Sequence, residues 1–136
     1  MARGDFDGDG RFDLAVTNSP SNSGGQGEDG LTVLLADGSG FRRLGTAPVH
    51  TGVAPTQVAV GDVDGDGRAE IAVSNMNSGT VSVAYLGRDS HVAIAETSRV
   101  GRLPKGIAAG DLNGDGKADL VVANNGDNDV AIVLTR

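Results

Sequence analysis

The 136-residue sequence contains no cysteine and no tryptophan, and it has only three Phe and one Tyr. The absence of cysteine excludes a disulfide framework, so the fold must be stabilised by packing or by bound metal. No apolar stretch reaches the length of a membrane span, which argues against membrane insertion. Basic residues are scarce, with 11 Lys and Arg against 18 Asp and Glu. The net charge of −7 therefore argues against nucleic acid and anionic membranes as partners.

What the chain does have is glycine, with 22 residues, and a 38% share of apolar residues. This composition fits thin, closely stacked sheets of Val, Ala and Leu. The length is that of one domain, 1–136, which can bury a modest core.

One fifteen-residue segment occurs three times, at 4–18, 61–75 and 110–124. Seven of its fifteen positions are identical in all three copies. Repetition of this kind decides the architecture before any other signal, because each copy specifies the same structural unit.

Acidic or amide side chains occupy positions one, three, five and nine of each loop, counted from its first Asp. These residues are Asp5, Asp7, Asp9 and Asp13; Asp62, Asp64, Asp66 and Glu70; and Asp111, Asn113, Asp115 and Asp119. So many carboxylates in nine residues repel one another, and a bound cation relieves that repulsion. The loops hold 11 of the 18 acidic residues, so three Ca²⁺ ions would bring the net charge from −7 to −1.

Calcium suits this pattern best, because it takes six to eight oxygen ligands in loose geometry, backbone carbonyls included. We expect three ions per chain, with the third site weakest because Asn113 replaces a carboxylate. Position seven (Arg11, Arg68 and Lys117) is expected to supply its carbonyl, with its basic side chain directed to solvent. Glycines at positions four and six allow the sharp turn.

The EF-hand shares the opening of this motif but is excluded by two observations. An EF-hand loop ends in a bidentate Glu at position twelve and lies between helices. Position twelve here is Val16, Val73 and Val122, and the flanking residues are short β-branched runs typical of strands.

The absence of any helical period predicts an all-β fold of three antiparallel repeat units, each a four-stranded propeller blade when complete. The units are expected at about 1–50, 54–98 and 103–136. The ten expected strands are Phe12–Thr17, Leu31–Leu35 and Phe41 to about Pro48; Thr56–Val60, Glu70–Ser74, Thr80–Leu86 and Val92–Thr97; and Gly106–Ala109, Asp119–Ala123 and Val130–Leu134. The terminal units are expected to be incomplete, since residues 1–3 look too few for an inner strand and the third unit has no outer one.

The motif Asp-x-[Asp/Asn]-x-Asp-Gly-x-x-[Asp/Glu] between two strands resembles the FG-GAP or VCBS repeat. The resemblance covers essentially the whole chain, with Glu70 as a departure from the usual Asp. It implies blades of a calcium-binding β-propeller like that of the integrin α-subunit. Three units do not close a ring, so we expect a partial propeller, completed by further blades or by a homo-oligomer formed through exposed edges.

For function, the resemblance implies an extracellular or cell-surface module for binding or adhesion, with a protein or glycan as ligand. The alternatives are a carbohydrate-binding propeller, or the non-catalytic propeller part of a secreted hydrolase or lyase. No enzyme motif gathers support, because His50 and His91 lack catalytic partners nearby in sequence. The chain starts without a signal peptide, so we expect a mature or excised segment.

A ligand surface is expected opposite the acidic loops. In a meander blade, the segments 19–30, 50–55, 75–79, 99–104 and 124–129 should gather there. The tripeptide Arg3-Gly4-Asp5 matches an integrin-recognition motif, but Gly-Asp opens every repeat and Asp5 is assigned to the metal.

Overall fold

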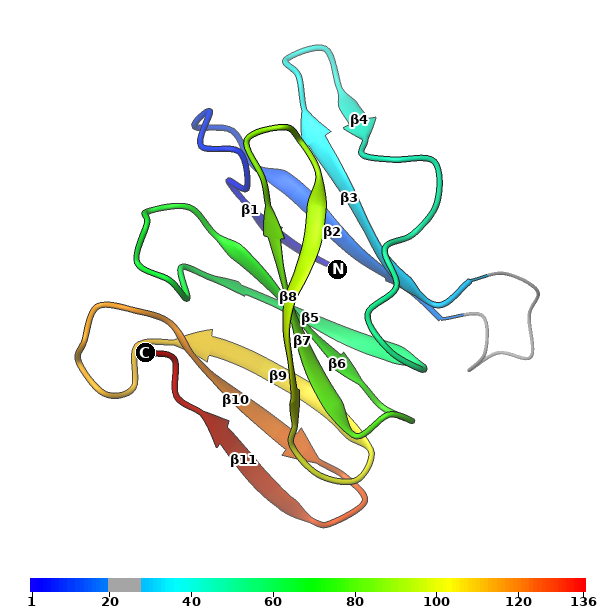
Figure 1. The fold of residues 1–136 in the computed structure, drawn as a ribbon, viewed down its shortest axis with the longest axis vertical. Coiled ribbons are helices and arrows are strands. Elements are labelled where there is room, and N and C mark those ends of the chain that lie inside the picture. The colour runs from blue at the N-terminus through cyan, green and yellow to red at the C-terminus, as the bar shows by residue number, and fades with distance from the viewer. Residues whose placement is uncertain (20–27) are drawn as a thin grey trace.

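The structure, a computed structural model, describes residues 1–19 and 28–136 (Figure 1). Within these ranges the chain forms strands and no helix, which confirms the all-β prediction. The strands are β1 (Ala2–Gly4), β2 (Asp13–Asn18), β3 (Gly30–Ala36), β4 (Phe41–Arg43), β5 (Pro55–Gly61), β6 (Glu70–Asn75), β7 (Thr80–Leu86), β8 (Val92–Arg99), β9 (Pro104–Gly110), β10 (Asp119–Asn124) and β11 (Asp129–Val133). A search of the described residues for a helix able to span a membrane found none.

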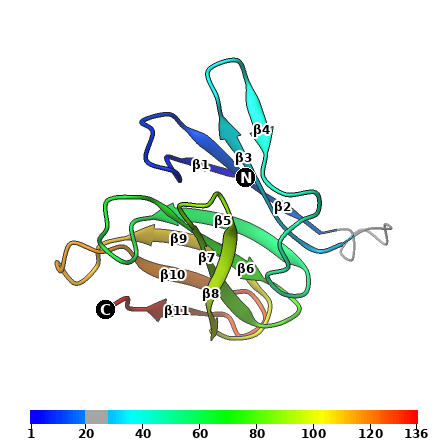
Figure 2. The same cartoon turned by 45° about the horizontal axis from the view of Figure 1, so that its top comes forward.

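The strands form three antiparallel sheets, which Figure 2 shows from a second side. Each sheet follows the chain as a meander. The first has the order β1-β2-β3-β4, the second β5-β6-β7-β8, and the third β9-β10-β11. The three repeats are therefore three separate sheets, as expected for blades, and over the described ranges they do not close into a ring.

The prediction that the first unit lacks its inner strand is wrong. β1 pairs with β2 through Arg3 opposite Leu14 and Gly4 opposite Asp13. The neighbouring sheet also supports this short strand, because a Cβ on Gly4 would lie only 2.6 Å from a methyl carbon of Val60. Glycine thus lets β1 approach β5 closely, which the count of residues before Asp5 did not reveal.

The outer strand of the first unit is shorter than predicted, because β4 ends at Arg43 and does not continue to about Pro48. Beyond it the chain still follows β3: Leu44 N donates to Val33 O at 2.9 Å, and Val49 pairs with Leu31 in an isolated bridge. The third sheet has three strands, as expected. With β1 included, the described residues form eleven strands instead of ten.

The three units share one strand register. In each unit, the residue after the position-nine acid pairs with an equivalent residue of the next strand. The three pairs are Leu14 with Leu34, Ile71 with Ala84, and Leu120 with Val133. Equivalent positions of the repeat therefore occupy equivalent places in the three sheets.

Two hydrophobic clusters hold the sheets together, one on each side of the middle sheet. Ile71 and Val73 of β6 lie in the cluster shared with the first sheet. Ala72, between them, lies in the cluster shared with the third sheet. Successive side chains of a strand point to opposite faces, so one strand serves both clusters. All six residues of β6 are buried, as expected for a sheet covered on both faces.

The connections lie at two opposite ends of the sheets. The three acidic loops share one end, on the left of Figure 1. At the other end the connections contact one another: Val53 N donates to Ser78 Oγ, and Val100 N donates to Gly79 O. The segments around 50–54, 75–79, 99–103 and 124–128 thus come together as expected, whereas most of the 19–30 loop lies outside the described residues.

Candidate metal centres in the acidic loops

Each acidic loop folds around the carboxylate at its first position. In the first loop, Asp5 accepts hydrogen bonds from the amide of Gly8 at 2.8 Å and from that of Gly10 at 2.9 Å. The same bonds recur from Gly65 (2.6 Å) and Gly67 (2.9 Å) to Asp62, and from Gly114 (2.7 Å) and Gly116 (3.0 Å) to Asp111. All six glycines have φ between +80° and +88°. A side chain would be strained there, so the geometry requires glycine at both positions.

The side chains at positions three and five are oriented by the amides two residues further on. Asp9 N donates to Asp7 Oδ1 at 3.1 Å, and Arg11 N donates to Asp9 Oδ1 at 2.8 Å. Equivalent bonds run from Asp66 N to Asp64, from Arg68 N to Asp66, from Asp115 N to Asn113 and from Lys117 N to Asp115. These Asx turns hold the side chains in place through the backbone.

The acid at position nine is buried in all three loops and links the loop to the sheet. Asp13 accepts a bond from Phe6 N at 2.9 Å and one from Ala36 N at 2.9 Å. Asp119 repeats this arrangement with the amides of Leu112 at 3.0 Å and Thr135 at 2.9 Å. Asp13 therefore fastens the start of its loop to β3, and Asp119 fastens the start of its loop to the residues just beyond β11.

Glu70 occupies position nine in the second loop and accepts a bond from Val63 N at 2.8 Å. Burial raises the pKa of its carboxyl group to about 7, and the charges of Asp64, Asp62 and Asp66 add to the rise. The bond from Val63 N opposes that rise but does not cancel it. A buried carboxylate surrounded by like charges is favoured only when a cation neutralises it.

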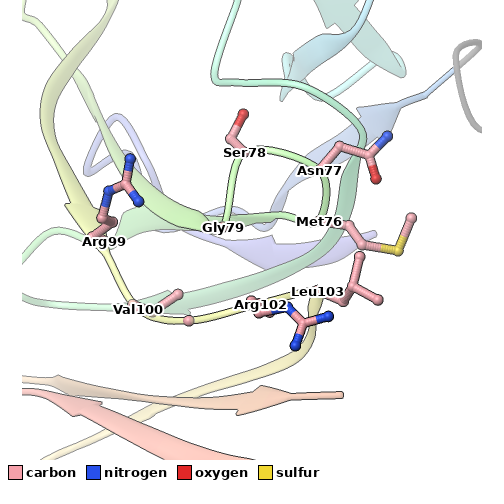
Figure 3. Close-up of a pocket in the computed structure, with 9 residues that line it drawn as sticks. Met76, Asn77, Ser78, Gly79, Arg99, Val100, Arg102 and Leu103 are labelled. Carbon is pink, nitrogen blue, oxygen red and sulfur yellow. The ribbon is translucent and has the colours of Figure 1, made fainter. Parts of the chain in front are cut away.

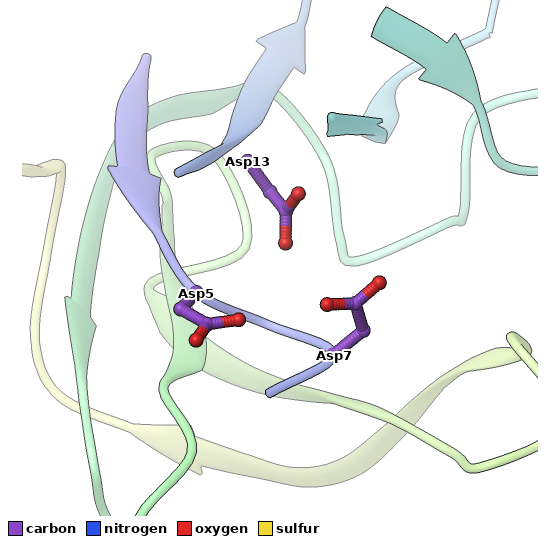
Figure 4. A group of neighbouring side chains, drawn as sticks. All are labelled: Asp5, Asp7 and Asp13. Atoms are coloured by element: carbon purple, nitrogen blue, oxygen red, sulfur yellow. The ribbon is translucent and has the colours of Figure 1, made fainter. Parts of the chain in front are cut away.

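Carboxylate oxygens converge in two of the loops. In the first, Asp5, Asp7 and Asp13 point toward one space (Figure 4), and one oxygen from each lies within 4.8 Å of the others. In the second, the equally close group is Asp62, Asp64 and Asp66. Desolvation, together with the neighbouring carboxylates, also raises the pKa of Asp7.

The third loop departs from this pattern. Asn113 Nδ2 donates to Asp115 Oδ2 at 3.0 Å, so the amide partly takes the place of a cation. Among the described residues of this loop, no group of three carboxylates comes as close as in the other two. The hydrogen bonds from the amides of Gly116 and Gly114 hold the pKa of Asp111 below its usual value.

In two of the loops the basic side chain at position seven, predicted to be directed to solvent, also pairs with an acid of its own loop while it stays partly exposed. Arg11 Nη1 lies 2.9 Å from Asp9 Oδ2, and Arg68 Nη2 lies 2.8 Å from Asp66 Oδ2. The hydrogen bond from Arg68 lowers the pKa of Asp66. Each arginine thus folds back onto the acid at position five, as the excess of negative charge in the loop favours.

The donor set fits a hard divalent cation. The converging side chains offer only oxygen atoms, and a shared network of amides fixes their positions. A soft metal would call for sulfur or imidazole ligands, which none of the three loops contains. The carbonyl groups of Arg11, Arg68 and Lys117 stay predicted ligands, since no contact in the structure tests them.

Sequence reasoning missed that the three loops are linked in series. Ala69 N, at position eight of the second loop, donates to Asp5 O at 3.3 Å. Ala118 N, at the same position of the third loop, donates to Asp62 O at 2.7 Å. The small residue at position eight of the second and third loops could have indicated this link. Each of these alanines packs against the hydrophobic cluster shared with the preceding sheet.

A groove lies at the opposite end, between the second and third sheets. It encloses about 600 Å³ and is lined by residues 76–79 and 99–103 (Figure 3). Met76 and Leu103 contribute apolar surface, and Arg99 and Arg102 contribute positive charge. Arg102 Nη1 lies 3.6 Å from Asp127 Oδ1. This groove is where the sequence predicted the ligand surface.

Comparison with known protein families identifies the repeat. A model of the FG-GAP-like repeat matches residues 5–73, and a model of the FG-GAP repeat matches residues 105–133. The chain therefore belongs to the FG-GAP repeat family, as the resemblance predicted.

Two curated proteins of Bacillus subtilis (strain 168) are similar to this chain. Rhamnogalacturonan endolyase YesW is 40% identical over 77 residues, which cover 52% of this chain and 12% of that protein. Rhamnogalacturonan exolyase YesX is 38% identical over 84 residues, which cover 57% of this chain and 14% of that protein. The chain thus corresponds to a small part of each relative.

Proposed function

We propose that this chain is a calcium-stabilised repeat module in which each acidic loop binds one structural Ca²⁺ ion. The threefold recurrence of the same oxygen positions on the same amide network carries the proposal. Positions one, three, five and nine would supply side-chain oxygens, and position seven a carbonyl. Calcium fits better than magnesium, because magnesium demands octahedral geometry and retains several waters.

The bound ion would neutralise carboxylates that the fold brings together. Without it, Asp5, Asp7 and Asp13 repel one another within one loop, and Glu70 is buried beside three further acids. With it, the same groups connect the two strands that flank each loop. The metal thus acts on stability, and we propose no catalytic role for this chain.

Melting curves with and without calcium test this proposal. A ligand that binds only the folded state adds roughly 2.7 kcal/mol per site at a hundredfold excess over its Kd. Chelation should therefore lower the melting temperature by more than about 10 °C. Asp64→Asn keeps the Asx turn but removes a charge, so it should reduce the shift that calcium produces.

Asp37→Asn is the matched control, because Asp37 accepts the amide of Ser39 in an exposed hairpin turn outside the acidic loops. It should leave the calcium-dependent shift unchanged. A melting temperature that is the same in calcium and in chelator would contradict calcium stabilisation.

For the ligand, the two relatives favour a role beside a polysaccharide-degrading part over cell adhesion. Both relatives are named for rhamnogalacturonan, a polymer that contains galacturonate, and each matches more than half of this chain. We propose that the module is the non-catalytic repeat part of a secreted lyase-like protein. Its groove beside Arg99 and Arg102 offers positive charge to an acidic glycan.

A glycan array separates the lyase-associated role from protein adhesion. We expect weak binding of galacturonate-containing oligosaccharides and none of neutral glucans. Arg99→Gln should reduce the signal, whereas Arg42→Gln, on the exposed strand β4, should not. Glycan binding that is unchanged by both substitutions would contradict the glycan role. An array without acidic glycans among its hits would contradict it as well.

A further inference from the structure

The outward face of the third sheet is apolar, and no part of the chain that the structure describes covers it. Leu120 and Val122 of β10 pack toward the middle sheet, so Val121 and Ala123 point the other way. Their partners on the neighbouring strands share this face: Ala108 and Ile132 beside Val121, and Gly106 and Val130 beside Ala123. Ile132 and Val130 are 60% and 61% exposed. We call these six residues the trailing face.

In the first two units, the following sheet covers the same repeat positions. The side chain at position two of the acidic loop is Phe6, Val63 or Leu112. Phe6 and Val63 are 1% and 5% exposed, since the following sheet packs over them. Leu112, which borders the trailing face, is 53% exposed. The difference arises from the neighbour and not from the type of residue.

The backbone gives the same comparison. Asp5 O and Asp62 O each accept the position-eight amide of the following loop, and Asp111 O is their equivalent. A Cβ on Gly61 would lie 2.7 Å from the Cβ of Ala118, whereas a Cβ on Gly110 would have no atom of residues 1–19 or 28–136 within 4 Å. In the first two units, the position-eight residue of the following unit packs beside this glycine. The equivalent place beside Gly110 is open.

The surface that fits this place is also present in the chain, on the first sheet. Leu14, Val16 and Leu34 are the equivalents of Ile71, Val73 and Ala84, which pack against the preceding sheet. With Phe12 at position eight, which is 60% exposed, they form what we call the leading face. Within the chain, a leading face contacts a trailing face twice.

We propose that the trailing face of one copy binds the leading face of a second copy, in the geometry of the two internal interfaces. Phe12 N of one copy would donate to Asp111 O of the other, and Leu112 and Ile132 would become buried. Because the two faces differ, the contact is head to tail, and it can extend to a ring or to a linear series.

Two blocking variants test the proposal, both at exposed side chains where a lysine does not disturb a core. Ile132→Lys blocks the trailing face, and Phe12→Lys blocks the leading face. Val53→Lys, at an exposed apolar residue on neither face, is the control. Mass is measured by sedimentation over a range of concentrations in calcium-containing buffer, and each variant is first shown to melt cooperatively.

The wild type and the control should rise above 13.6 kDa with concentration, and each blocked variant alone should stay at 13.6 kDa. An equimolar mixture of the two variants should form a one-to-one dimer, since each keeps the face that the other lacks. A wild type that stays monomeric at all concentrations, blocked variants that still self-associate, or a mixture that forms no dimer would each overturn the proposal.

Discussion

Glu70 shows how one residue sets the pH response of a loop. Its pKa rises to about 7 in the folded chain from an ordinary value of 4.5, so folding without metal favours the protonated form. Its stabilising contribution is complete below about pH 4.5 and is lost as the pH rises through about 7.

We therefore expect Glu70→Gln to stabilise the chain in calcium-free buffer at pH 8, because glutamine remains neutral there. At pH 4.5 the substitution should have little effect, since Glu70 is then mostly protonated. Denaturant melts of both proteins at the two pH values check the sign. An equal effect at both would mean that Glu70 does not titrate in this range. With calcium at pH 8 the order should reverse, because the variant loses a ligand.

Two asparagines at equivalent positions of the repeat differ in their hydrogen bonds. Asn75 Oδ1 accepts a hydrogen bond from Thr51 Oγ1 at 2.9 Å. Asn124 occupies the same place in the third sheet, and its buried Oδ1 has no hydrogen-bond partner among the described residues. Val100 stands where Thr51 stands in the second unit and has no hydroxyl to donate. The repeats therefore share their backbone more closely than their polar networks.

At the scale of the element, the acidic loop could be predicted from sequence and its surroundings could not. The recurrence of Asp and Gly at fixed offsets predicted the loop, because backbone amides and positive φ values are local properties. The ion pair of Arg68 with Asp66 was missed, since solvent and a carboxylate compete for the same guanidinium. β1 was missed because its partners, Leu14 of β2 and Val60 of β5, lie in other elements.

The third loop gives a prediction at this scale. In Asn113→Asp the amide that donates to Asp115 is replaced by a carboxylate. Without metal, the repulsion between the two acids should lower the melting temperature. With calcium, the added charge should tighten the third site. Melting curves in chelator and in calcium should therefore move in opposite directions, relative to wild type. A shift of the same sign in both would show that this loop does not hold the ion through position three.

At the scale of the molecule, two properties follow from repetition. One is that, within the described ranges, the middle sheet is buried on both faces, whereas the outer sheets each keep one open face. The other is that the acidic loops are joined by the bonds from Ala69 to Asp5 and from Ala118 to Asp62. Three sheets in sequence order could be predicted from the repeat alone. Their face-to-face order required the structure, because alternation along a strand does not say which neighbour each face meets.

Calorimetric titration of the metal-free chain with Ca²⁺ measures whether each acidic loop binds one calcium ion. We expect three ions per chain, with the third site weaker than the other two because Asn113 replaces an acid. Magnesium at the same concentrations should bind more weakly. A stoichiometry of one or zero, or equal affinity for both metals, would contradict calcium binding by all three loops.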